Sequence, residues 1–222
     1  MVTIDWFWVK SELLKKERIA KSESESAILA HLDECLEKAR GLAKPRIARA
    51  TKRISAFSDS GIELEGGARI PSKAVSKYIR GAASIELCVL TIGDDIEKEA
   101  TRLMESNDHL QGYLMDRIGS FAVESLAASF EEGLRNSGIE KGESVSARFS
   151  PGYCDWPIEE QFTLAKLIDF SAAGVQLAGS CMMVPKKSIS AIVAIGPKGL
   201  FSTTGSPCKI CNMKECDYRR EK

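Results

Sequence analysis

The longest helical pattern in the chain, residues 110–136, constrains the fold most. Apolar and small side chains recur along it at three- and four-residue steps, which places them on one face of a helix. Because the small side chains leave room at that face, we expect another element to approach it closely. Gly138 is expected to end the helix. The residues of this face are Leu114, Ile118, Phe121, Ala122, Ser125, Ser129 and Gly133.

Shorter patterns predict the elements around this helix. The chain contains neither a Gly-x-Gly-x-x-Gly run nor a phosphate-binding Gly-Lys-Ser loop. The order of strands and helices is mixed, which favours an α+β fold with one twisted, mainly antiparallel sheet flanked by helices. Strands are expected over 62–64, before a Gly66-Gly67 turn, over 84–93 and over 188–195. Helices are expected over 23–43, after the capping residue Ser72 as far as Ile79, from Asp94 or Asp95 to about Met104, and over 159–169.

Size and composition favour a single globular unit. With 222 residues, of which 44% are hydrophobic, the chain can form one substantial core. It has no internal repeat, so we expect one compact domain, residues 1–204, followed by a cysteine-containing tail, residues 205–222. Lys and Arg together number 31, as do Asp and Glu, so the net charge gives no general attraction to nucleic acid or membranes. Without a membrane span or signal peptide pattern, we expect a cytoplasmic protein.

The tail has a pattern typical of metal sites. Its three cysteines follow C-x2-C-x4-C spacing, which lets a tight turn direct thiolates at one ion, and nearby Lys and Arg side chains favour the thiolate form. The spacing fits zinc or an iron–sulfur cluster but not the ferredoxin run, so the metal stays open. Free or redox-active thiols are the alternative. The tail ligands are Cys208, Cys211 and Cys216, and the candidates for a fourth are Cys154, Cys181, Cys88 and Cys35.

The stretch SARFSPGYCDWPIEEQ, residues 146–161, carries the densest set of functional side chains. Arg148 can donate a planar fork of hydrogen bonds to a carboxylate or phosphate. The turn at Pro151-Gly152 exposes backbone groups, while Tyr153 and Trp156 offer flat faces for an adenine ring or a sulfonium cation. A rigid turn that packs aromatic rings into the core is the structural alternative. The part from Asp155 onward is interpreted mainly as the start of the next helix.

Histidine-based hydrolysis is not expected. His31 and His109 are the two histidines of the chain, and both fall in predicted helices or at their starts, apart from the central stretch. A Ser-His-Asp or Cys-His mechanism needs a histidine beside its nucleophile. We therefore interpret both as ordinary helical or surface residues.

The central stretch resembles a known family. Its R-x-S-P-G-Y run, followed by D-x-P-x-x-x-Q, is similar to the reactivation domain of cobalamin-dependent methionine synthase. The runs LTIGDDIE and MDRIGSFAVESLAASFEE resemble short stand-alone members from anaerobes. The resemblance covers roughly residues 50–200. A later segment matches the family through Gly174, Leu177, Ser180, Met183, Pro185, Ser188 and Ile189.

The resemblance implies a repair reaction on a corrinoid. Members of the family bind S-adenosylmethionine in a groove and dock over a cobalamin whose cobalt has fallen to the inactive Co(II) state. An electron donor such as flavodoxin or ferredoxin supplies one electron, and the sulfonium methyl group moves to cob(I)alamin. Such a transfer needs in-line positioning rather than a general base. The expected partner is a corrinoid protein or a methionine synthase core, and the expected activity is that of a methyltransferase acting only with this partner.

The resemblance also implies roles for individual residues. Arg148 would hold the carboxylate of S-adenosylmethionine. Phe149, Ser150 and Gly152 would supply backbone contacts. Tyr153 would lie beside the reacting sulfonium and the corrinoid, which makes it the expected catalytic residue.

Two positions depart from the family pattern. The family's long helix carries a carboxylate in an L-A-E-A-F run that contacts the ligand's amino group, whereas this chain has Ala128 at that position. Glu124, one turn earlier, is the expected substitute. Cys154 stands where the synthase has proline, which makes it the first candidate for the fourth ligand of the tail site.

Two other functions remain open at this point. The chain could be a non-catalytic zinc- or iron–sulfur-binding module whose basic stretch, residues 40–53, contacts nucleic acid or an acidic protein. Neutral net charge and the lack of a second C-x2-C pair argue against a zinc ribbon. Alternatively, the tail cysteines could hold a redox centre that supplies the activating electron.

Overall fold

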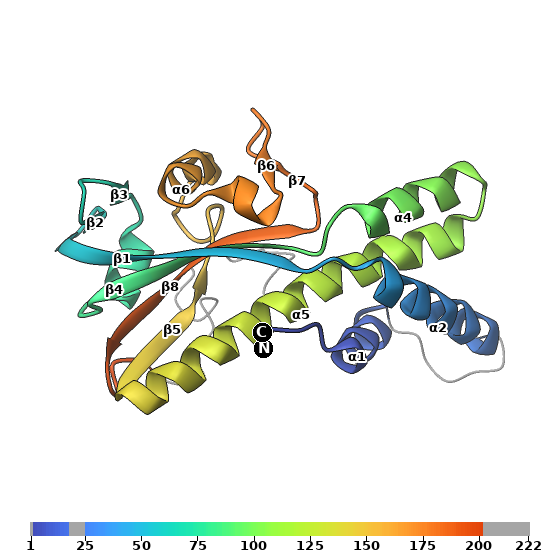
Figure 1. The fold of residues 1–222 in the computed structure, drawn as a ribbon, viewed down its shortest axis with the longest axis horizontal. Helices are drawn as coiled ribbons and strands as arrows, with labels where there is room; N and C mark the ends of the chain where they lie inside the picture. Colours follow the sequence, from blue (N-terminus) through green and yellow to red (C-terminus); the bar gives the residue numbers. More distant parts are fainter. Residues whose placement is uncertain (1, 18–24, 202–222) are drawn as a thin grey trace.

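The computed structural model describes residues 2–17 and 25–201, and an antiparallel sheet with helices on both faces forms its centre (Figure 1). The strand order is β3-β2-β1-β4-β8-β5, and a separate two-stranded hairpin joins β6 to β7. The predicted α+β class is therefore confirmed. The strands are β1 (Arg46–Ser58), β2 (Gly61–Leu64), β3 (Arg69–Ile70), β4 (Ser84–Thr91), β5 (Glu143–Phe149), β6 (Gln176–Leu177), β7 (Met183–Val184) and β8 (Ser188–Pro197).

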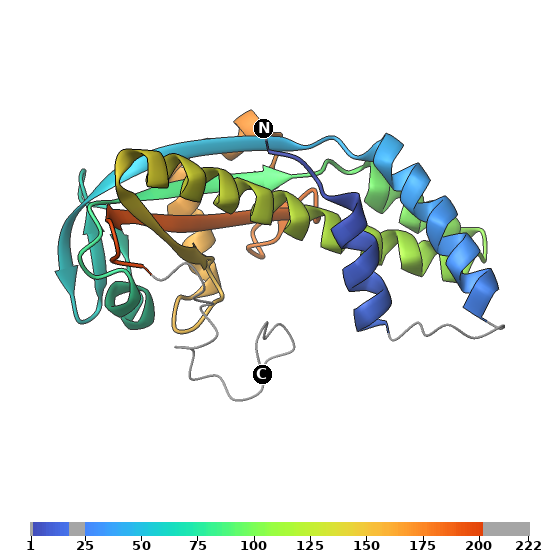
Figure 2. The same cartoon turned by 90° about the horizontal axis from the view of Figure 1, so that it is seen from below.

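The longest helix, α5, runs diagonally across one face of the sheet and extends beyond it to pack with α1, α2 and α4 (Figures 1 and 2). The opposite face is covered by α3, α6 and the 3₁₀ turn η2. This arrangement places the stretch 146–161 at the end of β5, beside α5. The helices are α1 (Trp6–Lys16), α2 (Glu25–Leu42), α3 (Lys73–Tyr78), α4 (Asp95–Glu105), α5 (His109–Lys141) and α6 (Gln161–Leu167), with 3₁₀ turns η1 (Ile158–Glu160) and η2 (Phe170–Ala173).

The alternation of side chains along β4 divides the core into two clusters. Cys88 and Leu90 point to the α5 face and pack with the long helix, whereas Leu87 and Val89 join the cluster under α3 and α6. A central strand that is buried on both faces has a nearly continuous run of apolar residues. This run is the pattern from which the strand at β4 was predicted. Its neighbours β1 and β8 pair with it in antiparallel register, Arg49 with Cys88 and Ala191 with Cys88.

The expected end of α5 at Gly138 is wrong. The helix continues to Lys141, and Gly142 ends it in the left-handed region with a φ of 71°. Gly138 serves packing instead, because a Cβ there would lie 3.0 Å from Cγ2 of Val145. The small residue thus lets β5 approach the helix.

The other predictions differ from the structure mainly at their boundaries. The strands at 62–64, 84–93 and 188–195 and the helix at 23–43 are confirmed, as is the Ser72 cap, whose Oγ accepts the Val75 N–H at 3.0 Å. The helix expected over 159–169 is shorter, because a 3₁₀ turn follows Pro157 before α6 begins. The sequence patterns missed α1 and β1. Strand β1 occupies much of the basic stretch 40–53, which had been expected only to flank a strand.

Among the helices of residues 2–17 and 25–201, none combines the length and apolar character needed to cross a lipid bilayer.

Candidate ligand-binding site

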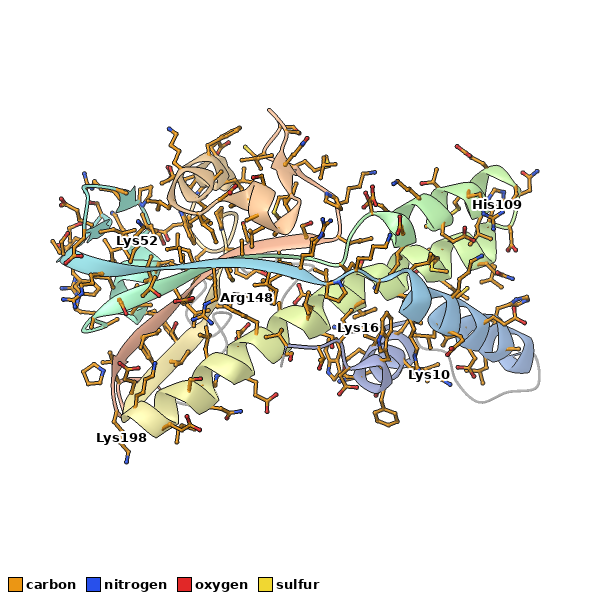
Figure 3. All side chains as sticks on the ribbon, viewed as in Figure 1. Lys10, Lys16, Lys52, His109, Arg148 and Lys198 are labelled. Atoms are coloured by element: carbon orange, nitrogen blue, oxygen red, sulfur yellow. The ribbon has the colours of Figure 1, made fainter. Side chains whose placement is uncertain are left out.

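Arg148 projects from β5 into the space between the sheet and α5, near the middle of the molecule (Figure 3). It lies opposite Val193 of β8, which faces the same helix. Its side chain is 3% exposed. A guanidinium group can remain charged at such a depth only if nearby groups of opposite charge compensate for its lost hydration.

Two acidic side chains of α5 provide this compensation. Nη2 of Arg148 donates to Oε2 of Glu124 at 2.7 Å, and Nε lies 3.1 Å from Oε1 of Glu131. Glu131 also accepts a hydrogen bond from Arg135 at 3.0 Å. Burial by itself would lower the pKa of Arg148, but the two carboxylates outweigh it and raise the pKa. Glu131 is 10% exposed, whereas the Glu124 side chain is 37% exposed and reaches the surface.

The hydrogen-bonding capacity of Arg148 is not used up. Within the described residues, Nη1 is buried without a hydrogen-bond partner, and Nε faces Glu131 as an ion pair without hydrogen-bond geometry. An unsatisfied buried donor costs roughly 1–3 kcal/mol. Nη1 is therefore a donor that a ligand oxygen could satisfy.

A compact turn follows directly after Arg148. Gly152 N donates to the Trp156 carbonyl at 2.8 Å, and Tyr153 N donates to the Ser150 carbonyl at 3.0 Å. Gly152 has a φ of 90° and Cys154 a φ of 55°, so the turn depends on two left-handed residues. The Tyr153 side chain is half-buried and close enough to Arg148 to contribute to its raised pKa. Phe149 pairs with Ile192 of β8, and its side chain points into the core on the opposite face of the sheet.

Two residues of the stretch serve the fold. Trp156 is 2% exposed and packs in the core on the α6 face, so for this ring the structural alternative, an aromatic residue packed into the core, holds. Asp155 does not start the next helix either. It accepts hydrogen bonds from Ser72 Oγ at 2.5 Å, Lys73 N at 2.8 Å and Ala74 N at 3.2 Å, and thereby fixes the turn to the first residues of α3. Its partial burial would raise its pKa, but these bonds lower it.

The N-terminal segment lies against the same helix, which sequence reasoning missed. Thr3 N donates to Ser129 Oγ at 3.1 Å, and Asp5 N donates to Ser125 Oγ at 2.8 Å. The small side chains of α5 therefore admit this segment. Asp5 Oδ1 caps α1 by accepting the Phe7 and Trp8 N–H groups, each at 3.0 Å. An aspartate directly before a helical pattern was the signal that could have predicted it.

The segment before β8, another part of the family resemblance, also reaches α5. Lys187 Nζ lies 2.7 Å from Asp116 Oδ1 and donates to Ser120 Oγ at 2.9 Å. Ser188 is buried, and its Oγ hydrogen-bonds Thr91 Oγ1 at 2.9 Å. Because Ser120 precedes Glu124 by one helical turn, three separate segments meet along the middle of α5.

The proposed metal ligands Cys208, Cys211 and Cys216 lie outside the described residues. Among the residues that are described, no group of three His, Cys, Asp or Glu side chains is placed to hold an ion. Cys35 and Cys88 are buried, and desolvation raises their pKa values to about 11 and about 12, which disfavours the thiolate that a metal requires. Cys154 and Cys181 are half-buried.

The histidines and the basic stretch contribute nothing to this site. His109 begins α5 at the far end of the helical half (Figure 3), and His31 contacts Gln111 at 3.1 Å. Within residues 40–53, Lys44 pairs with Asp95 and Arg49 with Glu86, each at 2.5 Å. These ion pairs reduce the charge that the stretch presents to an acidic partner.

Comparison with known families identifies the chain. The family "Vitamin B12 dependent methionine synthase, activation domain" matches residues 67–220, which include the Arg148 turn and all of α5. The chain belongs to this family. Comparison with curated proteins gave no match.

A solved activation domain has the same fold. The crystal structure of the MetH reactivation domain bound to AdoHcy matches with a TM-score of 0.62 over 92% of this chain and 76% of that chain. The two sequences are 17% identical, so the match concerns the fold. The predicted family and architecture are thus both confirmed.

Proposed function

We propose that this activation domain binds S-adenosylmethionine beside Arg148 and transfers its methyl group to the cobalt of a partner's corrinoid. Family membership supports the reaction class, and the MetH reactivation domain with the same fold was crystallised with AdoHcy, the product of such a transfer. The observation that carries the proposal within this chain is the buried guanidinium of Arg148, which keeps an unused donor at Nη1.

The ion pair between Arg148 and Glu124 suggests how the ligand enters. The ligand's carboxylate would bind across Nη1 and Nη2 of Arg148, and Nη2 now donates to the partly exposed Glu124 carboxylate. Binding would displace Glu124, whose carboxylate then becomes available to the ligand's ammonium group. This exchange keeps Arg148 neutralised throughout, and it compensates for Ala128, which stands where the family has an acidic residue.

The remaining contacts come from the turn and the N-terminal segment. The backbone groups of Phe149, Ser150 and Gly152 would hold the ligand, and Tyr153 would lie beside the sulfonium. Asp5 is a further candidate for the ammonium group. It is exposed, its backbone is bound to Ser125 beside Glu124, and its cap of α1 uses Oδ1.

The methyl transfer requires the side chains to position the ligand and requires no acid or base. A reductant such as flavodoxin or ferredoxin delivers one electron to the partner's Co(II). The Co(I) electron pair then attacks the methyl carbon, the carbon–sulfur bond breaks, and S-adenosylhomocysteine leaves with that bond's electrons. No proton moves, which fits a site without histidine. The role of the chain is to fix the sulfonium in line with the cobalt.

We also keep the tail cysteines as a proposed zinc or iron–sulfur site, with Cys154 as the fourth ligand. Cys154 follows Tyr153 in the turn, so such a site would bring the tail next to the bound methyl donor. Metal analysis and a visible spectrum of anaerobically purified protein test this. A redox cluster absorbs in the visible range, whereas zinc does not, and a protein without metal would contradict the proposal.

Calorimetry with S-adenosylmethionine tests the site itself. We expect saturable binding of micromolar order, which Arg148→Lys weakens strongly because a lysine lacks the planar fork. Arg102→Lys is the matched control, since the Arg102 side chain is exposed and pairs with Glu99 on α4, away from Arg148. Circular dichroism must show that the Arg148 variant is folded. Binding that is absent from the unaltered protein, or unchanged in a folded Arg148→Lys variant, would contradict the proposal.

A further inference from the structure

A cavity of about 480 Å³ lies between the C-terminal half of α5 and the sheet. Neither Arg148 nor Glu124 is among its lining residues, although Glu86 of β4 and Arg148 of β5 both lie opposite Val193 of β8, so the cavity adjoins the site above. Its volume is in the range of pockets that hold small molecules. Polar groups of β1 and β4 and apolar side chains of α5, β5 and β8 line it: Arg49, Thr51 and Glu86, with Phe130, Val145 and Ile195.

Glu86 is the unusual group in this cavity. It is 1% exposed, and Thr51 Oγ1 donates to its Oε2 at 2.6 Å. Oε1 lies 2.5 Å from Arg49 Nε as an ion pair, yet it accepts no hydrogen bond from any described residue. A buried carboxylate is costly unless its oxygens are satisfied. Its Oε1 is therefore an acceptor suited to a donor group that enters the cavity.

The partner of Glu86 remains accessible. The Arg49 side chain is 58% exposed, and its guanidinium carbon lies 5.9 Å from the centre of the Phe130 ring. The cavity thus presents a buried negative charge, a partly exposed positive charge and an aromatic surface together. Lys141 and Glu143 add one further charge of each sign to the lining.

A glycine of α5 opens the cavity. Gly133 lies in the helix, where glycine is a poor residue, and a Cβ built there would meet nothing within 4 Å. No close packing therefore requires it, in contrast to Gly138. The space in front of Gly133 belongs to the cavity, and Ser137 lines it one turn further along the helix.

We propose that this cavity binds a small zwitterion, an apolar α-amino acid, as a second ligand of the domain. Glu86 accepts the ammonium group, Arg49 binds the carboxylate, and the apolar side chain lies against Phe130 and Val145. Balanced charges favour a zwitterion over a simple anion or cation, because each isolated charge would meet a like charge in the lining. This ligand differs from the methyl donor in both place and size.

Calorimetric titration with L-leucine and L-methionine tests the proposal on the full chain. We expect saturable binding, which is weaker for N-acetyl-L-leucine, without the ammonium, and for isoamylamine, without the carboxylate. No saturable signal with either amino acid in the millimolar range would overturn the proposal. Equal binding of all four compounds would overturn the assignment of the two charged contacts.

Variants locate the binding. Glu86→Gln is expected to weaken leucine binding about tenfold or more, as when a charge-assisted hydrogen bond becomes a neutral one. Gly133→Leu should abolish binding by filling the cavity. The matched controls, Glu132→Gln and Asn136→Leu, lie on exposed positions of α5 outside the cavity and should bind normally. Thermal unfolding checks that Gly133→Leu is folded. We expect it to be, because no neighbour lies within 4 Å of a Cβ at this position.

Arg148→Lys separates the two sites. It should leave leucine binding unchanged if the amino acid occupies the cavity. Binding that survives Gly133→Leu in the folded protein but disappears in Arg148→Lys would place leucine at the methyl-donor site and overturn the proposal.

Discussion

The two acidic partners of Arg148 should contribute very differently to stability. Glu131 is 10% exposed and pairs with both Arg148 and Arg135, whereas Glu124 is 37% exposed and contacts the same guanidinium from the surface. Removing one partner of a fully buried pair costs about 3–5 kcal/mol. Because Glu124 still compensates Arg148, we expect Glu131→Gln to cost about 2–3 kcal/mol. For Glu124→Gln we expect a smaller cost of about 1 kcal/mol, because the Glu124 side chain is partly exposed and the amide oxygen of Gln can still accept from Nη2 of Arg148.

Urea unfolding at neutral pH, followed by circular dichroism, measures this difference. The dependence of the free energy on urea should stay the same among the variants, because the surface exposed on unfolding does not change. Glu132→Gln, at an exposed neighbouring position, is the control and should shift stability by less than about 0.5 kcal/mol. The reasoning is refuted if Glu124→Gln costs as much as Glu131→Gln, or if neither differs from the control.

Three further predictions concern a hydrogen-bonded aspartate, two glycines of α5 and two buried cysteines. Asp155→Asn should lower the free energy of unfolding by about 1 kcal/mol at pH 7. Because folding lowers the pKa of Asp155, this difference from the unaltered protein should disappear as the pH falls below about 4. Urea titrations at several pH values measure it. Gly133→Ala should raise the free energy of unfolding by about 1 kcal/mol, because alanine is the better helix former. Gly142→Ala should lower it by a similar amount, because Gly142, unlike Gly133, has a positive φ. Cys35 and Cys88 should resist alkylation until the protein unfolds, as peptide mass spectrometry can follow; rapid labelling in the native state would contradict their burial and raised pKa values.

Residue periodicity predicted the elements that are buried on one or both faces. The face of α5 and the apolar run of β4 carry their signal within a few neighbouring residues, so the sequence alone was enough. Strand β1 was missed because it mixes basic residues with alanines and hydroxyl residues and remains partly exposed. The division of the chain at residue 204 stays a prediction, because residues 202–222 lie outside the described ones.

Of the candidate site, the sequence alone could predict the turn that carries Arg148 but not the residues that surround it. The Arg148 turn stands out in the sequence through its prolines, glycine and aromatic residues. Its partners do not, because Glu124 is 24 positions away and its proximity depends on how α5 crosses β5. Asp155 is a similar case: its partner Ser72 is 83 positions away, so no local pattern could distinguish a cap of α3 from the start of α6. The N-terminal segment on α5 likewise follows from tertiary packing.

The most direct test of the central claim is methyl transfer to a corrinoid in trans. A methionine synthase fragment that carries cob(II)alamin but lacks its own activation domain is mixed with this chain, S-adenosylmethionine and a low-potential reductant, and its visible spectrum is followed. We predict that methylcobalamin forms, with equimolar S-adenosylhomocysteine, only when the chain is present, and much more slowly with Arg148→Lys. Formation at the same rate without the chain would contradict the proposed function.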